Sequence, residues 1–215
     1  MIMVSADAVV HGLERNHMEF FELMHKRTSS RKFTDEPLTE EEISKILEAG
    51  ALAPVGSNRY PNLHFTVVTD KAVLKTIAEA SQIRRSNSEE MAAIINNVSN
   101  AEEILEQSRS YDPFYDAAAV IFVSHRKQDL EPNIQWCNAT SVILAMHLAT
   151  VDMGLGSCYM WFALDSMRRI PELDHTDLLN LPEDFEPLLG LAVGHIAKPL
   201  AERSIDVGRI ARNDI

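Results

Sequence analysis

The stretch NIQWCNATSVILAMHLATVD, residues 133–152, has the pattern of one long helix and decides how the other elements can be arranged. Its apolar side chains recur at helical spacing, and Ile143 and Met146 widen the stripe that they form. The stripe itself consists of Ile134, Cys137, Ser141, Leu144, Leu148 and Val151. Because such a helix is apolar almost all round, we expect it at the centre of the fold or in a subunit interface.

The most apolar part of this helix does not predict a membrane span. Residues 141–151 are interrupted by His147 and are about half as long as the ~20 residues that cross a bilayer. Gly154 and Gly156 are expected to end the helix, and the segment SCYMWFA then leads into a weaker helical region at residues 164–169.

Three apolar segments rich in β-branched residues are expected to form buried strands. They are LHFTVVT at residues 63–69, AAAVIFVS at residues 117–124 and LLGLAV at residues 188–193. Helical patterns occupy residues 18–26, 71–81 and 89–107, and YDPFYD at residues 111–116 is an aromatic-rich loop. The residues alone therefore predict three core strands with helices between them.

A further helix has a readable start. Thr39 stands at the N-cap position, and Glu42, three residues later, is its capping-box partner. The helix must end before Pro54, which lacks the backbone N–H that the helix would need. The loop VGSNRYPN, residues 55–62, follows.

Length and charge narrow the class of protein. At 215 residues, with no linker or internal repeat, the chain is expected to form one compact domain over residues 18–215, with residues 1–17 a leader or a disordered N-terminus. The net charge of −12, from 32 acidic and 20 basic residues, argues against nucleic-acid binding and against attraction to anionic membranes. An anionic ligand would therefore need a local cluster of cations.

The cysteines and the N-terminal residues indicate the compartment. Cys137 and Cys158 form no C-x-x-C pair, so neither a disulfide framework nor a thiolate metal site is predicted. The first residues lack the pattern of a secretory signal. A cytoplasmic location is the simplest expectation.

The segment KRTSSRKF, residues 26–33, has two interpretations. It could be a solvated turn between helices, whose hydroxyl groups bond their own backbone. It could instead bind a phosphate, since Arg27 and Arg31 carry planar forks of donors and Ser29 carries a hydroxyl. The residues of this segment alone favour the turn.

Other polar residues carry little signal on their own. Asn58 and Gly56 lie in a connection that needs no function, although an amide and a glycine suit close ligand contact. His147 is expected to be a satisfied helix histidine and not a metal ligand, since no other ligand stands at metal-site spacing. Cys158 has no base nearby in the sequence. No pair of carboxylates suggests a hydrolase.

Taken in order, several segments resemble the FMN-dependent nitroreductase family. They are RTSSRKF at 27–33, FTDEPLTEEEISKILEAGALAP at 33–54, the Gly/Ser-Asn-x-x-Pro loop, GLGSCYMW at 154–161 and LLGLAVGHIAKPLAER at 188–203. The resemblance covers most of residues 18–203. It implies an α+β fold with a central, mixed but mainly antiparallel sheet flanked by helices. It also implies an intertwined homodimer with FMN at the interface.

The resemblance also implies which residues of the arginine-containing motif bind FMN. Arg27 and Ser29 would hold the phosphate, Thr28 would add a contact, and Arg31 would approach the pyrimidine edge of the flavin and tune it. Near the C-terminus, Arg203 matches a second phosphate-binding arginine.

Further cofactor contacts are implied by position. Asn58, with Gly56 beside it, would contact the isoalloxazine ring. Backbone groups of Tyr159, Met160 and Trp161 would lie against the flavin. Lys198 is a neighbour of the second phosphate-binding arginine.

The chain departs from the family pattern in two places. Many members have N-x-Q-P-W where this chain has NRYPN at residues 58–62, which affects details of the flavin pocket. Residues 84–116 match no family motif, so the substrate pocket stays unassigned.

The activity implied by the resemblance is ping-pong oxidoreduction. NAD(P)H would give a hydride to the flavin and leave, and an oxidised small molecule such as a nitro compound or a quinone would then be reduced. Because the flavin carries this chemistry, no catalytic side chain is predicted. The alternatives are a specialised flavoenzyme, such as a reductive dehalogenase or a flavin-modifying enzyme, a flavin-binding protein without turnover, and an interaction protein without a cofactor.

Overall fold

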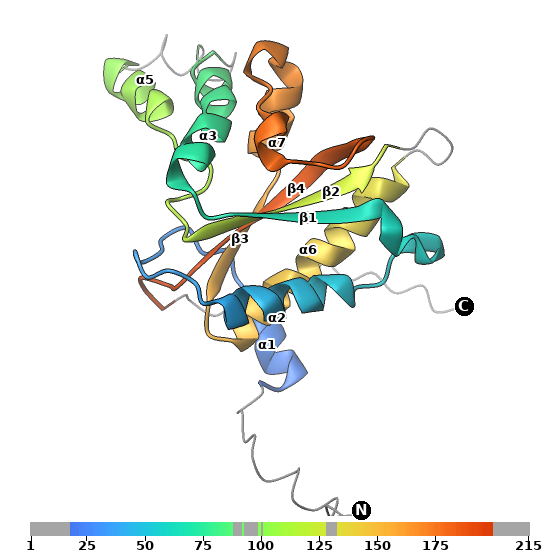
Figure 1. The fold of residues 1–215 in the computed structure, drawn as a ribbon. Helices are drawn as coiled ribbons and strands as arrows, with labels where there is room; N and C mark the ends of the chain where they lie inside the picture. The colour runs from blue at the N-terminus through green and yellow to red at the C-terminus, as the bar shows by residue number, and fades with distance from the viewer. Residues whose placement is uncertain (1–17, 88–91, 93–98, 100, 128–132, 200–215) are drawn as a thin grey trace, which may run out of the picture.

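The computed structural model describes residues 18–87, 92, 99, 101–127 and 133–199, and within them a four-stranded antiparallel sheet forms the centre of the molecule (Figure 1). The strand order is β1-β2-β4-β3. The strands are β1 (Leu63–Val68), β2 (Ala119–Arg126), β3 (Gly156–Met160) and β4 (Phe185–Gly194). The predicted leader at residues 1–17 lies outside the described residues.

The central strand β2 supplies side chains to two separate cores. Val120 and Phe122 belong to the cluster on one face of the sheet, and Ile121 and Val123 belong to the cluster on the other. Successive residues of a strand point to opposite faces, so a strand buried on both sides is apolar throughout. This explains why residues 117–124 show no polar alternation.

Helices cover both faces of the sheet. The helices α2 (Glu40–Ala51) and α6 (Ile134–Asp152) contribute to one core, and α3 (Lys71–Ser86) and α7 (Phe162–Arg169) contribute to the other. The short helix α1 (Phe20–Lys26) contacts α6, and α5 (Ala101–Arg109) contacts α3. Short 3-10 turns lie at Gly56–Asn58, Tyr60–Asn62, Pro171–Leu173 and Thr176–Leu179.

The expected long helix is confirmed as α6, which lies between α2 and the sheet (Figure 1). The packing of α2 on α6 depends on Gly50, because a Cβ at that position would collide with the side chain of Met146. On its outer side α6 leaves Leu144 48% exposed. No helix among the described residues is long and apolar enough to cross a membrane.

The predicted capping box is confirmed at the start of α2. The hydroxyl of Thr39 accepts a hydrogen bond from the backbone N–H of Glu42 at 3.2 Å, and the Glu42 carboxylate accepts one from the N–H of Thr39 at 2.7 Å. The helix ends at Ala51, before Pro54, as expected.

The expectation of three strands missed β3. The segment SCYMWFA was expected only to connect two helices, but residues 156–160 pair with β4 along the edge of the sheet. This strand is five residues long and begins at a glycine and a serine, which are weak strand formers. Its pairing with β4 determines its structure, and that pairing is not visible in the segment itself.

Candidate functional site

The residues 27–33, which we call the arginine stretch, lie along the edge of the sheet. The N–H of Ser30 donates to the carbonyl oxygen of Ser157 in β3, and the N–H of Thr34 donates to the carbonyl oxygen of His195, each at 2.9 Å. Isolated bridges join Ser29 to Ser157 in parallel and Phe33 to Ile196 in antiparallel orientation. The arginine stretch is therefore an extended segment bonded to its neighbours, and not a free turn between helices.

A glycine makes this arrangement possible. A Cβ at Gly156 would lie 2.5 Å from Oγ of Ser30 and would also collide with the side chain of Ile196. The arginine stretch, β3 and the segment after β4 thus meet where only a hydrogen atom fits.

The outer edge of β3 continues past the arginine stretch. The carbonyl of Ser157 points away from β4 toward Ser30, and backbone groups alternate in direction along an antiparallel strand. The backbone groups of Tyr159 therefore also face this edge, whereas those of Met160 face β4. The Met160 side chain is buried in the core, and the Tyr159 and Trp161 side chains are exposed. Of the three predicted backbone contacts, Tyr159 has the better placement within the strand.

Arg27 reaches into the molecule and meets the central helix. Its Nη1 lies 3.2 Å from Nε2 of His147, and Nδ1 of His147 lies 3.1 Å from Oγ of Ser157. Burial, and then the positive charge of Arg27, lower the pKa of His147 to about 4. His147 is therefore neutral at pH 7, and its interpretation as a satisfied helix histidine is confirmed. No cluster of three metal-binding side chains occurs in the described part of the chain.

Arg31 lies against an aromatic residue that sequence reasoning did not select. Its Cζ is 5.9 Å from the centre of the Tyr115 ring, and hydrogen bonding to Tyr115 raises the pKa of the guanidinium. Cys158 is close by, and burial raises the pKa of its thiol, against the effect of Arg31. The thiol is thus protonated at neutral pH.

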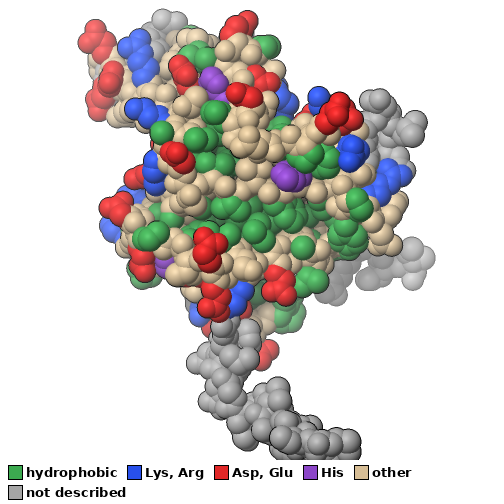
Figure 2. Space-filling view, viewed as in Figure 1, with side chains coloured by type: hydrophobic (Ala, Val, Ile, Leu, Met, Phe, Trp, Pro, Cys, Tyr) green, Lys and Arg blue, Asp and Glu red, His purple; other side chains and the backbone are tan. Residues whose placement is uncertain are grey.

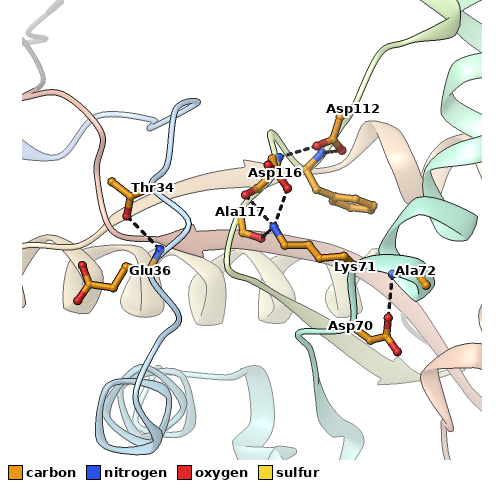
Figure 3. Close-up of polar contacts among 9 residues, drawn as sticks. Thr34, Glu36, Asp70, Lys71, Ala72, Asp112, Asp116 and Ala117 are labelled. Atoms are coloured by element: carbon orange, nitrogen blue, oxygen red, sulfur yellow. Dashed lines mark hydrogen bonds and ion pairs between the residues drawn. The ribbon is translucent and has the colours of Figure 1, made fainter.

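The turn that carries Tyr115 is held in an unusual conformation. Tyr115 and Asp116 have φ of 56° and 55°, a left-handed region that residues other than glycine seldom adopt. Nζ of Lys71 donates to Oδ1 of Asp116 at 2.7 Å and to the carbonyl oxygen of Ala117 at 2.8 Å, and the carboxylate of Asp112 accepts from the N–H of Phe114 at 2.8 Å (Figure 3). The Asp-x-x-x-Asp spacing in this loop was the signal that could have pointed to this turn.

A third cation lies opposite Arg31 in the backbone register. The bridge between Phe33 and Ile196, together with a hydrogen bond from the N–H of Ala197 to the carbonyl oxygen of Lys32, places Lys198 opposite Arg31 in register. Lys26 instead pairs with Glu22 on the surface of α1. The predicted Arg203 lies outside the described residues.

Gly56 and Asn58 lie elsewhere in the chain. The N–H of Gly56 donates to Oδ1 of Asn138 at 2.8 Å, near the start of α6, whereas Arg27 meets His147 nine residues further along. At 1.5 Å per residue these two contacts are about 14 Å apart along the helix axis. In Figure 1 the turn between α2 and β1 and the segment between α1 and α2 lie at opposite ends of the molecule. One chain does not bring Asn58 to the arginine stretch.

Comparisons with known proteins agree on one family. A sequence model described as the Nitroreductase family matches residues 24–195. A putative NADH dehydrogenase/NAD(P)H nitroreductase of Archaeoglobus fulgidus is 36% identical over 77 residues, which are 36% of this chain and 44% of that protein. An NADPH-dependent oxidoreductase of Staphylococcus epidermidis is 27% identical over 81% of this chain and 63% of its own length. The chain therefore spans less than two thirds of either relative.

The fold is also found among solved structures. A nitroreductase with bound FMN from Bacteroides fragilis superposes with a TM-score of 0.71 at 23% identity, covering 90% of this chain and 98% of that one. The expected α+β fold is thus confirmed. The sheet is antiparallel throughout in the residues that the structure describes, and the parallel contact is the bridge between Ser29 and Ser157.

Proposed function

Because the chain belongs to the nitroreductase family, we propose that it is an FMN-dependent oxidoreductase that passes a hydride from NAD(P)H to a small oxidised molecule. The observation that carries this proposal is the docking of the arginine stretch on the edge of β3. That stretch carries Arg27 and Arg31, and Lys198 lies opposite Arg31 in register, in a chain whose net charge is −12. Such a cluster suits a ligand with a phosphate group.

The side chains present fit the phosphate of FMN. The guanidinium group of Arg27 provides charged donors, and the hydroxyl of Ser29 provides a neutral one. The hydroxyl of Thr28 is buried without a hydrogen-bond partner among the described residues, which is an uncommon and costly state for a polar atom. We assign Arg27, Thr28 and Ser29 to the phosphate, with Lys198 and Arg203 as further cations.

The remaining contacts concern the flavin ring. FMN supplies the hydride chemistry when it is bound, so the chain has to bind and orient it. Arg31, held against Tyr115, keeps a fixed positive charge where negative charge develops as the ring is reduced. Backbone groups of Tyr159, Met160 and Trp161 are assigned to the ring, with Tyr159 supported by its outward edge.

A second copy of the chain would complete the site. Since Gly56 and Asn58 lie at the far end of α6, we propose that they reach the flavin from the partner subunit of a homodimer. Apolar side chains left exposed on one chain support this, including Leu52 at 75%, Leu144 at 48% and Phe21 at 77%. Figure 2 shows hydrophobic side chains gathered over the region where Figure 1 places α2 and β1.

The hydride donor and the molecule that is reduced are also part of the proposal. The names of the two relatives include NADH and NADPH, and either nucleotide is proposed as the donor. The proposed acceptors are nitro compounds, quinones and similar small molecules, reduced in a ping-pong cycle. We propose a cytoplasmic location, which the free thiols of Cys137 and Cys158 support.

The absorbance of freshly purified protein tests this function. We expect a yellow protein that releases FMN on denaturation, is bleached by NADH or NADPH without oxygen, and regains its colour when a quinone or a nitroaromatic is added. A colourless protein that binds no added FMN would refute the proposal. If the protein is yellow but neither nucleotide reduces it, the chain binds flavin without having the proposed activity.

A further inference from the structure

Arg27 contacts His147 of α6, and His147 belongs to a ring of hydrogen bonds. The other members of this ring are the side chains of Ser157 and Thr150. Nε2 of His147 lies 3.2 Å from Nη1 of Arg27, and Nδ1 lies 3.1 Å from Oγ of Ser157. Oγ of Ser157 lies 2.6 Å from Oγ1 of Thr150, which donates to the carbonyl oxygen of His147 at 2.7 Å. His147, Thr150 and Ser157 are all buried.

The donors and acceptors in this ring can be assigned in one way. A guanidinium group only donates, so Nε2 of His147 must accept, and the imidazole proton then sits on Nδ1. Nδ1 donates to Ser157. The hydroxyl of Thr150 already donates to a carbonyl, so its oxygen accepts the proton of Ser157. Arg27 thus fixes the position of the imidazole proton, and the carbonyl oxygen of His147 fixes those of Thr150 and Ser157.

A protonated His147 would break this arrangement. Nε2 would lose the lone pair that accepts from Arg27, and two cations would face each other in a buried place. Burial, and then the charge of Arg27, lower the pKa of His147 to about 4, while a hydrogen bond to the backbone of Thr28 acts in the opposite direction. Ser157 and the backbone of Thr28 are the other polar groups that face the imidazole, and both are neutral.

We propose that His147 is a positioning residue that, as a neutral Nδ1–H imidazole, orients the guanidinium of Arg27 toward the phosphate of FMN. The proposal rests on the proposed function, in which Arg27 binds that phosphate. A guanidinium carries five N–H donors in one plane, so a bond to His147 fixes the plane in which the others act. The arginine then loses less conformational freedom when the ligand binds.

Two substitutions of His147 separate positioning from a general structural role. His147→Phe keeps an aromatic ring but removes the acceptor, and His147→Gln keeps an acceptor for Arg27 and a donor for Ser157. The dissociation constants of FMN and of riboflavin, which lacks the phosphate, are measured for each variant by quenching of flavin fluorescence.

We expect His147→Phe to weaken FMN binding about tenfold and to leave riboflavin binding unchanged, because a bond to a charged group is lost at the phosphate only. His147→Gln should stay within about threefold of the parent, since it restores the bond. In the Arg27→Ala background, His147→Phe should have no further effect on FMN. Equal losses for FMN and riboflavin, or no loss for either, would overturn the positioning role.

The tautomer of His147 gives a readout that needs no flavin. A long-range ¹H–¹⁵N spectrum at pH 7 should show His147 protonated on Nδ1 alone. In Arg27→Ala this constraint is removed, and we expect the population of the Nε2–H tautomer to rise. An Nε2–H form or an imidazolium in the parent would refute the bond to Arg27. If the parent shows the Nδ1–H form but binds no FMN, the proposed function fails and His147 positions Arg27 for another purpose, so phosphate positioning fails with it.

Discussion

The N–H of Ser30 donates to the carbonyl oxygen of Ser157 at 2.9 Å, and this bond attaches the arginine stretch to the edge strand β3. Ser157 also bonds through its side chain to His147, which contacts Arg27. The backbone and the side chain of one serine therefore connect to two points of the arginine stretch. The position and orientation of Arg27 both depend on how closely that stretch approaches β3.

Gly156→Ala tests this close approach. The added Cβ would collide with Ser30 and Ile196, so the arginine stretch must move away from β3. We expect a loss of about 1 to 3 kcal/mol in the free energy of unfolding, together with weaker FMN binding. Denaturant melts and flavin titration measure both quantities. Gly190→Ala is the comparison for stability, because its Cβ would come no closer than 3.3 Å to a neighbour, and it should lose less stability than Gly156→Ala. An unchanged Gly156→Ala protein would contradict the role of this contact.

The contact between Arg31 and Tyr115 predicts that substitutions there change the rate of flavin reduction and not the binding of FMN. Arg31→Ala should leave FMN bound through the phosphate contacts but slow reduction by NAD(P)H, because the fixed positive charge at the ring is lost. Tyr115→Phe keeps the ring that lies by Arg31 and removes its hydroxyl, so its effect should be smaller. Stopped-flow bleaching at full FMN occupancy measures the rate. Equal rates in the parent and Arg31→Ala would exclude this role for Arg31.

Much of the fold followed from local patterns. The capping box at Thr39, the apolar stripe of α6 and the three buried strands depend on residues close to one another in the chain. Such patterns report local backbone preference and burial, which is why these elements were predicted correctly. The short strand β3 was missed because its structure depends on β4, about 30 residues away.

The candidate site was less accessible to sequence reasoning. Arg27 and Arg31 were selected by family resemblance, since their own segment favoured a turn. The partners that hold them, His147 and Tyr115, are distant in the chain or lie in a loop with positive φ. The separation of Asn58 from Arg27 could not be read from the sequence, because it depends on where both segments meet α6.

Thr39→Ala tests whether the capping box stabilises the fold without affecting the site. The substitution removes the acceptor for the N–H of Glu42, and we expect a loss of about 1 kcal/mol in the free energy of unfolding. Since Thr39 is exposed and lies outside the arginine stretch, FMN affinity should not change. Thermal denaturation and flavin titration of the same sample measure both. Thr39→Ser keeps the hydroxyl and should restore stability, and a failure to do so would argue against the cap.

The lowered pKa of His147 predicts how stability depends on pH. In the unfolded chain His147 titrates near 6.5, and in the folded protein near 4, so between these values the unfolded state binds more protons. Stability should therefore be full above pH 6.5 and fall as the pH is lowered toward 4. At about 1.4 kcal/mol per pH unit the loss amounts to about 3 kcal/mol.

Urea melts between pH 7 and pH 4 measure this loss. His147→Gln is the comparison, because it keeps the hydrogen-bonding groups and does not titrate. The difference in the free energy of unfolding between the parent and His147→Gln should change across this pH range. A constant difference would mean that His147 has an ordinary pKa in the folded protein.

Arg27 and Asn58 lie far apart along α6, which predicts that variants of the two residues restore FMN binding when they are mixed. If each flavin site combines Arg27 of one subunit with Asn58 of the other, Arg27→Ala and Asn58→Ala homodimers each carry two defective sites. A mixed dimer then has one intact site and one site with both defects. After unfolding and refolding an equal mixture, we expect tight FMN binding to return to about a quarter of all sites, because half of the dimers are mixed and half of their sites are intact.

The double variant Arg27→Ala/Asn58→Ala, mixed with the parent, is the control. Its mixed dimers carry one defect in each site, so they should contain no intact site. If both residues served the same subunit, the first mixture would stay defective, whereas each mixed dimer of the control would keep one intact site.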